Sequence, residues 1–241
     1  MNVAQQQKNV LFISLEMSAN LLALRLLSSQ TGVPALDIEY GRLTHEQLQR
    51  VQNAREAART LNFDLYDDSM LSDGLLERVK NYKERKGLDL LIVDYLSLLR
   101  DPSSFGETER VTKIVGNLRE VARICDMPVI AFAQLNREVE KREGNLPTLS
   151  DFRDSGSIEQ DAGVAAFLYR PHYYAMMHDD ADPVDCEDDA QIILAKNRQG
   201  PTGSLKVKFY PKLMKWEDNR PEIVTPQNTN ASTLVAKVRV R

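Results

Sequence analysis

Cysteine is scarce in this sequence: the 241 residues include only Cys125 and Cys186. The two lie far apart and match none of the spacings that zinc sites use, so we expect neither a zinc site nor a disulfide framework. Cys125 falls on the apolar face of a helical pattern, where a buried thiol is the simpler interpretation.

Long hydrophobic runs and an excess of positive charge are also missing. No apolar run approaches the roughly 18 residues of a membrane-spanning helix, and no basic segment followed by an apolar block marks a signal peptide. We therefore expect a cytoplasmic protein without a membrane partner. The 31 Lys and Arg against 35 Asp and Glu give a net charge of −4, so a nucleic-acid partner would have to be held by local loops.

The stretch from Leu88 to Leu99 (LDLLIVDYLSLL) is the most apolar part of the chain, and it follows Gly87. Such a run predicts a strand buried on both faces of a parallel sheet. Asp94 then lies at the carboxyl end of a core strand, where open α/β sheets bind ligands and where a carboxylate can hold the metal of a Mg-nucleotide. Taken alone, this stretch fits equally well a strand that simply ends in a capping Asp and has no role in metal binding.

A second strand with the same design precedes it. The apolar run from Val10 to Leu15 ends at Glu16, and Ser18 is well placed to cap a following helix. Two core strands that each deliver a carboxylate suit one acid that organises a metal and another that polarises an attacking water. Glu16 could instead be a first-turn residue favoured by the helix dipole.

The elements between and after these strands alternate between helix and strand. The expected order is a helix from a Thr44–Gln47 capping box through Arg59, a strand at Phe63–Tyr66, a helix capped by Ser72 or Asp73 through Lys86, a helix at Thr108–Ile124, and a strand at Pro128–Ala133. This alternation predicts an α/β fold with a mostly parallel sheet flanked by helices. Gln134 ends the last of these strands, where it could sense a γ-phosphate, although a lone strand-end Gln proves little.

The C-terminal part predicts antiparallel strands. A long charged segment, 136–158, is expected to lack its own structure and to be functional or disordered, although its mixed charges also fit a solvated surface. Strands follow at Ala162–Tyr169 and Ala190–Leu194, and Ile192–Ala195 forms a hairpin with Leu205–Phe209. Lys196 and Arg198, in the turn region, could serve as an arginine finger.

Five segments together resemble a known family. They are SLEMS (14–18), LLIVDYLSLL (90–99), QLNR (134–137), SDFRDSGSIEQDA (150–162) and AKNRQGPTG (195–203). In this order they are similar to successive motifs of the C-terminal ATPase domain of DnaB-type replicative DNA helicases. The resemblance implies a RecA-like domain that forms a homo-hexameric ring, hydrolyses ATP with Mg²⁺ at subunit interfaces and translocates on single-stranded DNA, with primase and a helicase loader as further partners.

The resemblance also implies roles for individual residues. Glu16 would activate water, Asp94 would be the acid behind Mg²⁺, Gln134 the sensor, and Arg25 a further nucleotide-site residue. Lys196 and Arg198 would reach the neighbouring subunit's site. The DNA-gripping loop would include three residues: Arg153, Asp154 and Gly156.

The sequence departs from the family at two places. No GxxxxGK[ST] phosphate-binding loop occurs among its eleven glycines, so the chain resembles a family member that begins a few residues after that loop. Asp154 replaces the family's usual Glu. We expect a helicase ATPase domain at 1–219 and a flexible tail at 220–241.

Two function classes remain open after the departures are considered. The first is an ATP-driven helicase motor, and the second is a non-catalytic RecA-like ring or interaction subunit. A recombinase of the RecA group is disfavoured by the SGSIEQDA and NRQGPTG segments.

Overall fold

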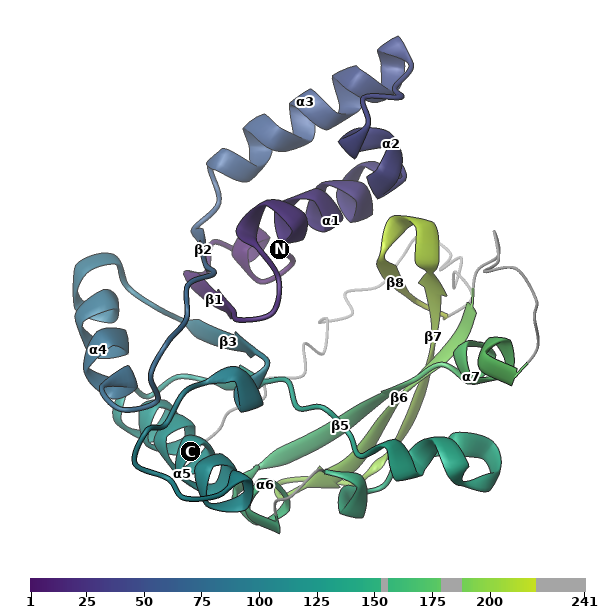
Figure 1. Ribbon diagram of the computed structural model, residues 1–241. Helices are drawn as coiled ribbons and strands as arrows, with labels where there is room; N and C mark the ends of the chain where they lie inside the picture. Colours follow the sequence, from purple (N-terminus) through teal and green to yellow (C-terminus); the bar gives the residue numbers. More distant parts are fainter. Residues whose placement is uncertain (153–155, 179–187, 220–241) are drawn as a thin grey trace, which may run out of the picture.

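The computed structural model describes residues 1–152, 156–178 and 188–219, and they form two separate four-stranded sheets (Figure 1). The parallel sheet has the order β2-β1-β3-β4, and the antiparallel sheet has the order β5-β6-β7-β8. The strands are β1 (Val10–Ser14), β2 (Phe63–Tyr66), β3 (Leu90–Asp94), β4 (Val129–Ala131), β5 (Val164–Tyr169), β6 (Asp188–Asn197), β7 (Gly203–Tyr210) and β8 (Lys215–Asp218). The predicted α/β architecture with C-terminal antiparallel strands is confirmed, whereas the predicted tail at 220–241 lies outside the described residues.

Helices connect the parallel strands and continue into the C-terminal part. The α-helices are α1 (Ala19–Thr31), α2 (Ala35–Glu39), α3 (His45–Arg59), α4 (Leu75–Lys86), α5 (Glu107–Ile124), α6 (Gly156–Asp161) and α7 (Pro171–His178). The 3-10 helices are η1 (Ala4–Gln6), η2 (Leu96–Leu98), η3 (Arg137–Lys141), η4 (Glu143–Asn145), η5 (Leu149–Asp151) and η6 (Pro211–Leu213). None of the described helices is long and apolar enough to cross a membrane.

The main core lies between one face of the parallel sheet and helices α4 and α5. Alternate residues of β1 and β3 supply its sheet side, including Ile13, Leu91 and Val93, and all three are almost fully buried. Ile114 of α5 and Leu75 of α4 close it from the helix side. Burial of these side chains positions β1 and β3 beside each other.

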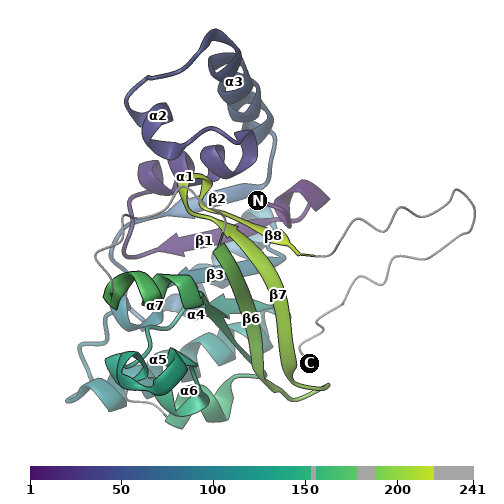
Figure 2. The same ribbon diagram turned by 90° about the vertical axis from the view of Figure 1, so that its right-hand side faces the viewer.

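The opposite face of the sheet carries a smaller apolar cluster around Val10, Leu90 and Ala4. Helices α1, α2 and α3 lie together at one end of the molecule, away from α4 and α5 (Figures 1 and 2). The predicted helix starts are confirmed at two of them: Ser18 accepts from the Leu21 amide, and Thr44 and Gln47 form the expected capping box.

The predicted position of Asp94 at the end of a core strand is confirmed, because β3 ends at Asp94 and the chain then turns into η2. The predicted start of α4 is wrong. Neither Ser72 nor Asp73 caps α4. Gly74 takes that position with a positive φ of 79°, which glycine adopts without strain, while the Ser72 hydroxyl donates to buried Asp101 at 3.2 Å.

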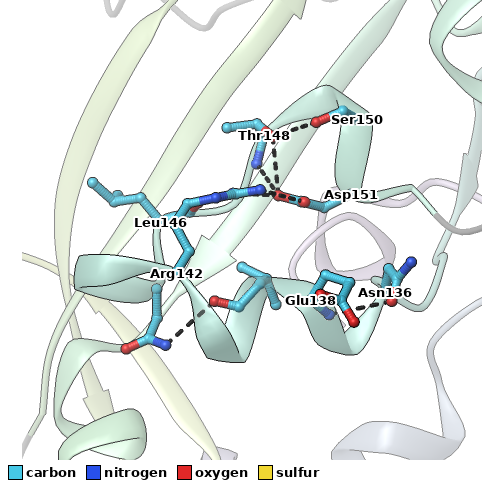
Figure 3. A network of polar contacts seen from close by, with 9 residues as sticks. Asn136, Glu138, Arg142, Leu146, Thr148, Ser150 and Asp151 are labelled. Atoms are coloured by element: carbon cyan, nitrogen blue, oxygen red, sulfur yellow. Dashed lines mark hydrogen bonds and ion pairs between the residues drawn. The ribbon is translucent and has the colours of Figure 1, made fainter.

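The charged segment 136–158 was expected to lack structure, and this expectation is wrong for the described residues. Three short 3-10 helices fold it around buried Asp151 (Figure 3). Arg142 donates to both carboxylate oxygens of Asp151 at 2.7 and 2.8 Å, and the Thr148 amide donates to one of them at 2.7 Å. A bidentate ion pair with an additional backbone donor thus stabilises the fold of this segment.

Candidate functional site

Glu16 and Asp94 come together at the carboxyl end of the parallel sheet. Strands β1 and β3 pair in parallel with Ser14 opposite Asp94, and the Leu15 amide donates to the Asp94 carbonyl at 2.7 Å. Glu16 lies two residues after the end of β1, which is the strand next to β3. Both acids are therefore at the same edge of the sheet, as the two apolar runs predicted. The peptide bond between Asp94 and Tyr95 is cis.

The pKa of Asp94 is shifted by its surroundings, which include two charged neighbours. Burial raises the pKa of the Asp94 carboxyl, the negative charge of Glu16 raises it further, and the positive charge of Arg25 lowers it. The site thus contains two carboxylates that repel each other and one guanidinium that partly offsets the repulsion. A cation bound there would relieve the same repulsion.

Three residues at this edge were missed by the sequence analysis. The buried Ser14 hydroxyl donates to the Met17 carbonyl at 2.7 Å, and the Met17 sulfur lies 3.2 Å from Arg25 Nη1. Asp67, just after β2, accepts from the Ala19 amide at 2.6 Å and so caps the start of α1. The sequence did carry a signal for Asp67, because it is an acidic residue directly after β2, as Glu16 comes soon after β1.

The donor set fits Mg²⁺ with a nucleotide better than a metal enclosed by protein. Within the described ranges no group of three or more His, Cys, Asp or Glu side chains gathers around a common point. Mg²⁺ is usually bound through one or two carboxylates together with phosphate oxygens and waters. Asp94, with Glu16 beside it, supplies that limited number of protein oxygens.

Gln134 lies at the same edge of the sheet but outside the carboxylate pair. Strand β4 ends at Ala131, three residues before Gln134, and the Leu96 amide donates to the Phe132 carbonyl at 2.9 Å. This bond ties the chain after β4 to the chain after β3. The Gln134 side chain is exposed.

Lys196 and Arg198 are engaged elsewhere in their own chain. Lys196 Nζ donates to the carbonyls of Glu159 and Gln160, and Arg198 Nη2 donates to the Gln160 carbonyl. The Arg198 amide also donates to the Gly163 carbonyl at 3.0 Å. Both cations therefore stabilise the carboxyl end of α6, where cations complement the helix dipole.

The predicted DNA-binding loop is only partly described. Arg153 and Asp154 lie outside the described residues, whereas Gly156 is exposed at the start of α6. The same short helix thus begins at a predicted DNA-binding residue and ends at the carbonyls that Lys196 and Arg198 contact.

Relatives with this sequence pattern are replicative helicases. "Replicative DNA helicase DnaB" of Rickettsia bellii is 35% identical over 237 residues, which cover 90% of this chain and 48% of the relative. The protein of the same name from Geobacillus stearothermophilus is 33% identical over 224 residues, with the same two coverages. The chain thus spans about half the length of these relatives.

Solved structures match the fold over nearly the whole chain. One that is described as an ATPase domain matches with a TM-score of 0.82 and 28% identity, covering 91% of this chain and 77% of that one. Another, described as "The Structure Of A DnaB-Like Replicative Helicase And Its Interactions With Primase", matches with a TM-score of 0.81 and 28% identity, covering 91% and 52%. The expected RecA-like fold is confirmed. The family model described as "DnaB-like helicase C terminal domain" matches residues 1–218, and the chain belongs to that family.

Proposed function

We propose that this chain is the motor domain of a replicative DNA helicase, in which ATP hydrolysis at subunit interfaces drives translocation on single-stranded DNA and duplex unwinding. The observation that carries the proposal is the carboxylate pair Glu16 and Asp94 at the carboxyl end of the parallel sheet. In this family's fold, that edge is where an α/β sheet binds its ligand.

The two acids take different roles in the proposal. Asp94, with the raised pKa, is the group whose charge Mg²⁺ would compensate, and Mg²⁺ would neutralise charge on the phosphates of ATP. Glu16 is exposed, so its carboxylate can accept a proton from a water molecule that attacks the terminal phosphate. Arg25 would contact the nucleotide, and Gln134 would sense the terminal phosphate.

Assembly and partners extend the proposal. Arg198, with Lys196, would leave the end of α6 to stabilise charge at a neighbouring subunit's site in a homo-hexamer. Arg153, Asp154 and Gly156 would grip the DNA backbone. Primase and a helicase loader are the expected protein partners, and the cytoplasm is the expected location.

A non-catalytic ring or interaction subunit is the second candidate. It is favoured by the hydrogen bonds through which Lys196 and Arg198 contact carbonyls of their own chain at the end of α6. The present bracing of Lys196 and Arg198 against α6 would then be their only role.

The test compares ATP hydrolysis by this chain with hydrolysis by a longer form that carries a family-type GxxxxGK[ST] segment ahead of Met1. The 241-residue chain is expected to hydrolyse ATP no faster than its own Glu16→Gln variant. In the longer form, Glu16→Gln should lower turnover by about 10²-fold or more while nucleotide binding persists, since general-base catalysis contributes roughly 10² to 10⁴. Asp94→Asn should weaken Mg-nucleotide binding as well.

Glu39→Gln is the matched control, because Glu39 is an exposed carboxylate on α2, away from the site. Its turnover should equal that of the unmodified protein. Equal loss of nucleotide binding in the Glu16 and Asp94 variants would show that their roles are assigned wrongly. A longer form without any Glu16-dependent hydrolysis would favour the non-catalytic subunit.

A further inference from the structure

Phe105 exposes its ring completely, although the chain on both sides of it is fixed. Its relative exposure is 101%, the largest among the exposed large apolar side chains of the described residues. Single exposed apolar side chains are common on protein surfaces, so exposure alone indicates nothing. Phe105 differs from them because a well-anchored loop, residues 101–106, presents it just before α5.

Hydrogen bonds anchor this loop at its beginning. Buried Asp101 accepts from the Ser103 amide at 3.0 Å, from the Ser103 hydroxyl at 2.6 Å and from the Ser72 hydroxyl at 3.2 Å. Lys113 of α5 donates to the Ser103 carbonyl and hydroxyl at 3.3 and 3.2 Å. A ring on a fixed backbone loses little conformational freedom when it binds a ligand.

Phe105 does not have the structural role that its position could give it. It precedes Gly106, the N-cap of α5, and an apolar residue there often packs against the fourth residue of the helix. That fourth residue is Arg110, whose guanidinium donates to two backbone carbonyls around η2. The Phe105 amide donates to Glu109 at 3.1 Å, so the backbone is used at the helix start while the ring remains available to a ligand.

The start of α6 lies toward the same end of α5 as this loop. Helices α5 and α6 lie side by side (Figures 1 and 2). The Thr112 hydroxyl of α5 donates to the Ser157 hydroxyl of α6 at 3.3 Å, and Arg119 pairs with Asp161 at 2.7 Å. Because the later residue of α5 contacts the later residue of α6, the two helices run in the same direction.

Phe105 is therefore close to Gly156, the described residue of the predicted DNA-binding loop. Gly156 directly precedes Ser157, which contacts Thr112. Only six residues separate Thr112 from Gly106, about 9 Å of helix at 1.5 Å per residue. A single strand of DNA held at Gly156 would pass within reach of the ring.

The charges around the ring are already paired with one another. Arg110 pairs with Glu107 at 2.5 Å, and Lys113 pairs with Glu109 at 3.1 Å. Cations that are paired in this way attract phosphates weakly, so the ring is the feature of the loop that suits DNA. Aromatic rings stack on the bases of single-stranded DNA, and every base has a face on which to stack.

We propose that Phe105 stacks on a base of the single strand whose backbone is held at Gly156. The inference rests on the proposed function, because it takes single-stranded DNA as the ligand. A stacked base would cover apolar surface that is now exposed to water. Stacking does not depend on the base sequence, which suits a motor that moves along any sequence.

The test measures binding of the full 241-residue chain to two labelled probes, single-stranded oligothymidylate and an abasic strand of the same length. Phe105→Ala should weaken binding to oligothymidylate by about tenfold, since stacking on one base contributes roughly 5- to 150-fold in affinity. Binding to the abasic strand should be unchanged. The loss should be the same at low and high salt, because the ring releases no counterions.

Two further variants complete the test. Phe105→Trp should keep the affinity, and its added indole fluorescence should be quenched by oligothymidylate beyond any change of Trp216 in the unmodified chain. Tyr40→Ala is the matched control, because Tyr40 is an exposed aromatic residue at the end of α2. It should bind both probes as the unmodified chain does.

Three results would overturn the inference, and they separate it from the proposed function. If Phe105→Ala binds oligothymidylate as tightly as the unmodified chain, Phe105 does not stack on DNA, while DNA binding itself stands. Equal weakening on both probes would show that the ring supports the loop or the backbone contact rather than a base. If the unmodified chain binds neither probe, the DNA-binding part of the proposed function fails together with the inference.

Discussion

At the scale of single residues, Asp94 is held in an environment that opposes its charge. Burial and Glu16 both raise the pKa of its carboxyl. The unfolded chain ionises Asp94 at its ordinary pKa and the folded chain only at a higher one, so ionisation costs folding stability as the pH rises above these values.

We expect Asp94→Asn to raise the free energy of unfolding at pH 7 when no nucleotide or Mg²⁺ is present, because the neutral amide avoids this cost. Glu16→Gln should raise it as well but by less, since burial is the larger cause of the shift. Urea unfolding at pH 7 measures both, with Glu39→Gln as the control that should leave stability unchanged. A lower free energy of unfolding for Asp94→Asn would contradict this account.

The two acids were predictable from the sequence because their signal is local. Each follows an apolar run, and parallel pairing of the runs brings their ends together. The proximity of Arg25 rested on family resemblance alone, since a single Arg within a helical pattern has no distinctive spacing. The contact between the Ser14 hydroxyl and the Met17 carbonyl depends on a turn that no periodicity describes.

At the scale of elements, the segment 136–158 depends on one ion pair. Arg142 and the Thr148 amide hold the pKa of buried Asp151 at about 2, below its usual 3.8. A lowered pKa in the folded state provides stability above the unfolded value, and this stability is lost as the pH falls from about 4 to about 2.

Asp151→Asn is therefore expected to lower the free energy of unfolding by about 2 kcal/mol at pH 7, from a shift of almost two units at 1.36 kcal/mol each. The difference between the variant and the unmodified protein should shrink toward zero near pH 2. Chemical denaturation at several pH values checks this, and Glu138→Gln, an exposed acid in the same segment, should change stability little. A pH-independent difference would point to packing rather than to the charge of Asp151.

The order of this segment was not predictable from local patterns. Arg142 and Asp151 lie nine residues apart among many other charges, and nothing in the sequence marks which pair becomes buried. The starts of α1 and α3 were predictable because each has an apolar period and a capping residue at its start, whereas α4 begins at Gly74 without a side-chain cap and α2 was not predicted.

At the scale of the whole molecule, the question is whether Arg198 acts on its own chain or on a neighbour. If it acts on a neighbour, Arg198→Ala subunits and Glu16→Gln subunits of the longer form should each be inactive alone. Mixed rings should recover DNA-stimulated ATP hydrolysis at interfaces that pair an intact Glu16 with a neighbour's intact Arg198. A finger supplied in trans can contribute about 10³-fold or more in rate.

The measurement is ATP hydrolysis after mixing the two purified variants under conditions of subunit exchange. The control mixture combines Glu16→Gln subunits with Leu36→Ala subunits, because Leu36 is an exposed residue of α2. Its rate of ATP hydrolysis should be proportional to the fraction of subunits that have an intact Glu16. If mixed rings form and activity stays at the level of the separate variants, Arg198 only braces α6.

Helix α6 connects a predicted DNA-binding residue at its start with the carbonyls that Lys196 and Arg198 contact near its end. It is six residues long, about 9 Å at 1.5 Å per residue, and Arg119 of α5 pairs with Asp161 at its end. Its first residue belongs to the predicted DNA grip, and its last carbonyls accept from Lys196 and Arg198. If Arg198 leaves those carbonyls to meet a neighbour's nucleotide, Lys196 and Arg119 alone would hold that end of α6, so the neighbour's nucleotide state would bear directly on a helix that starts at Gly156.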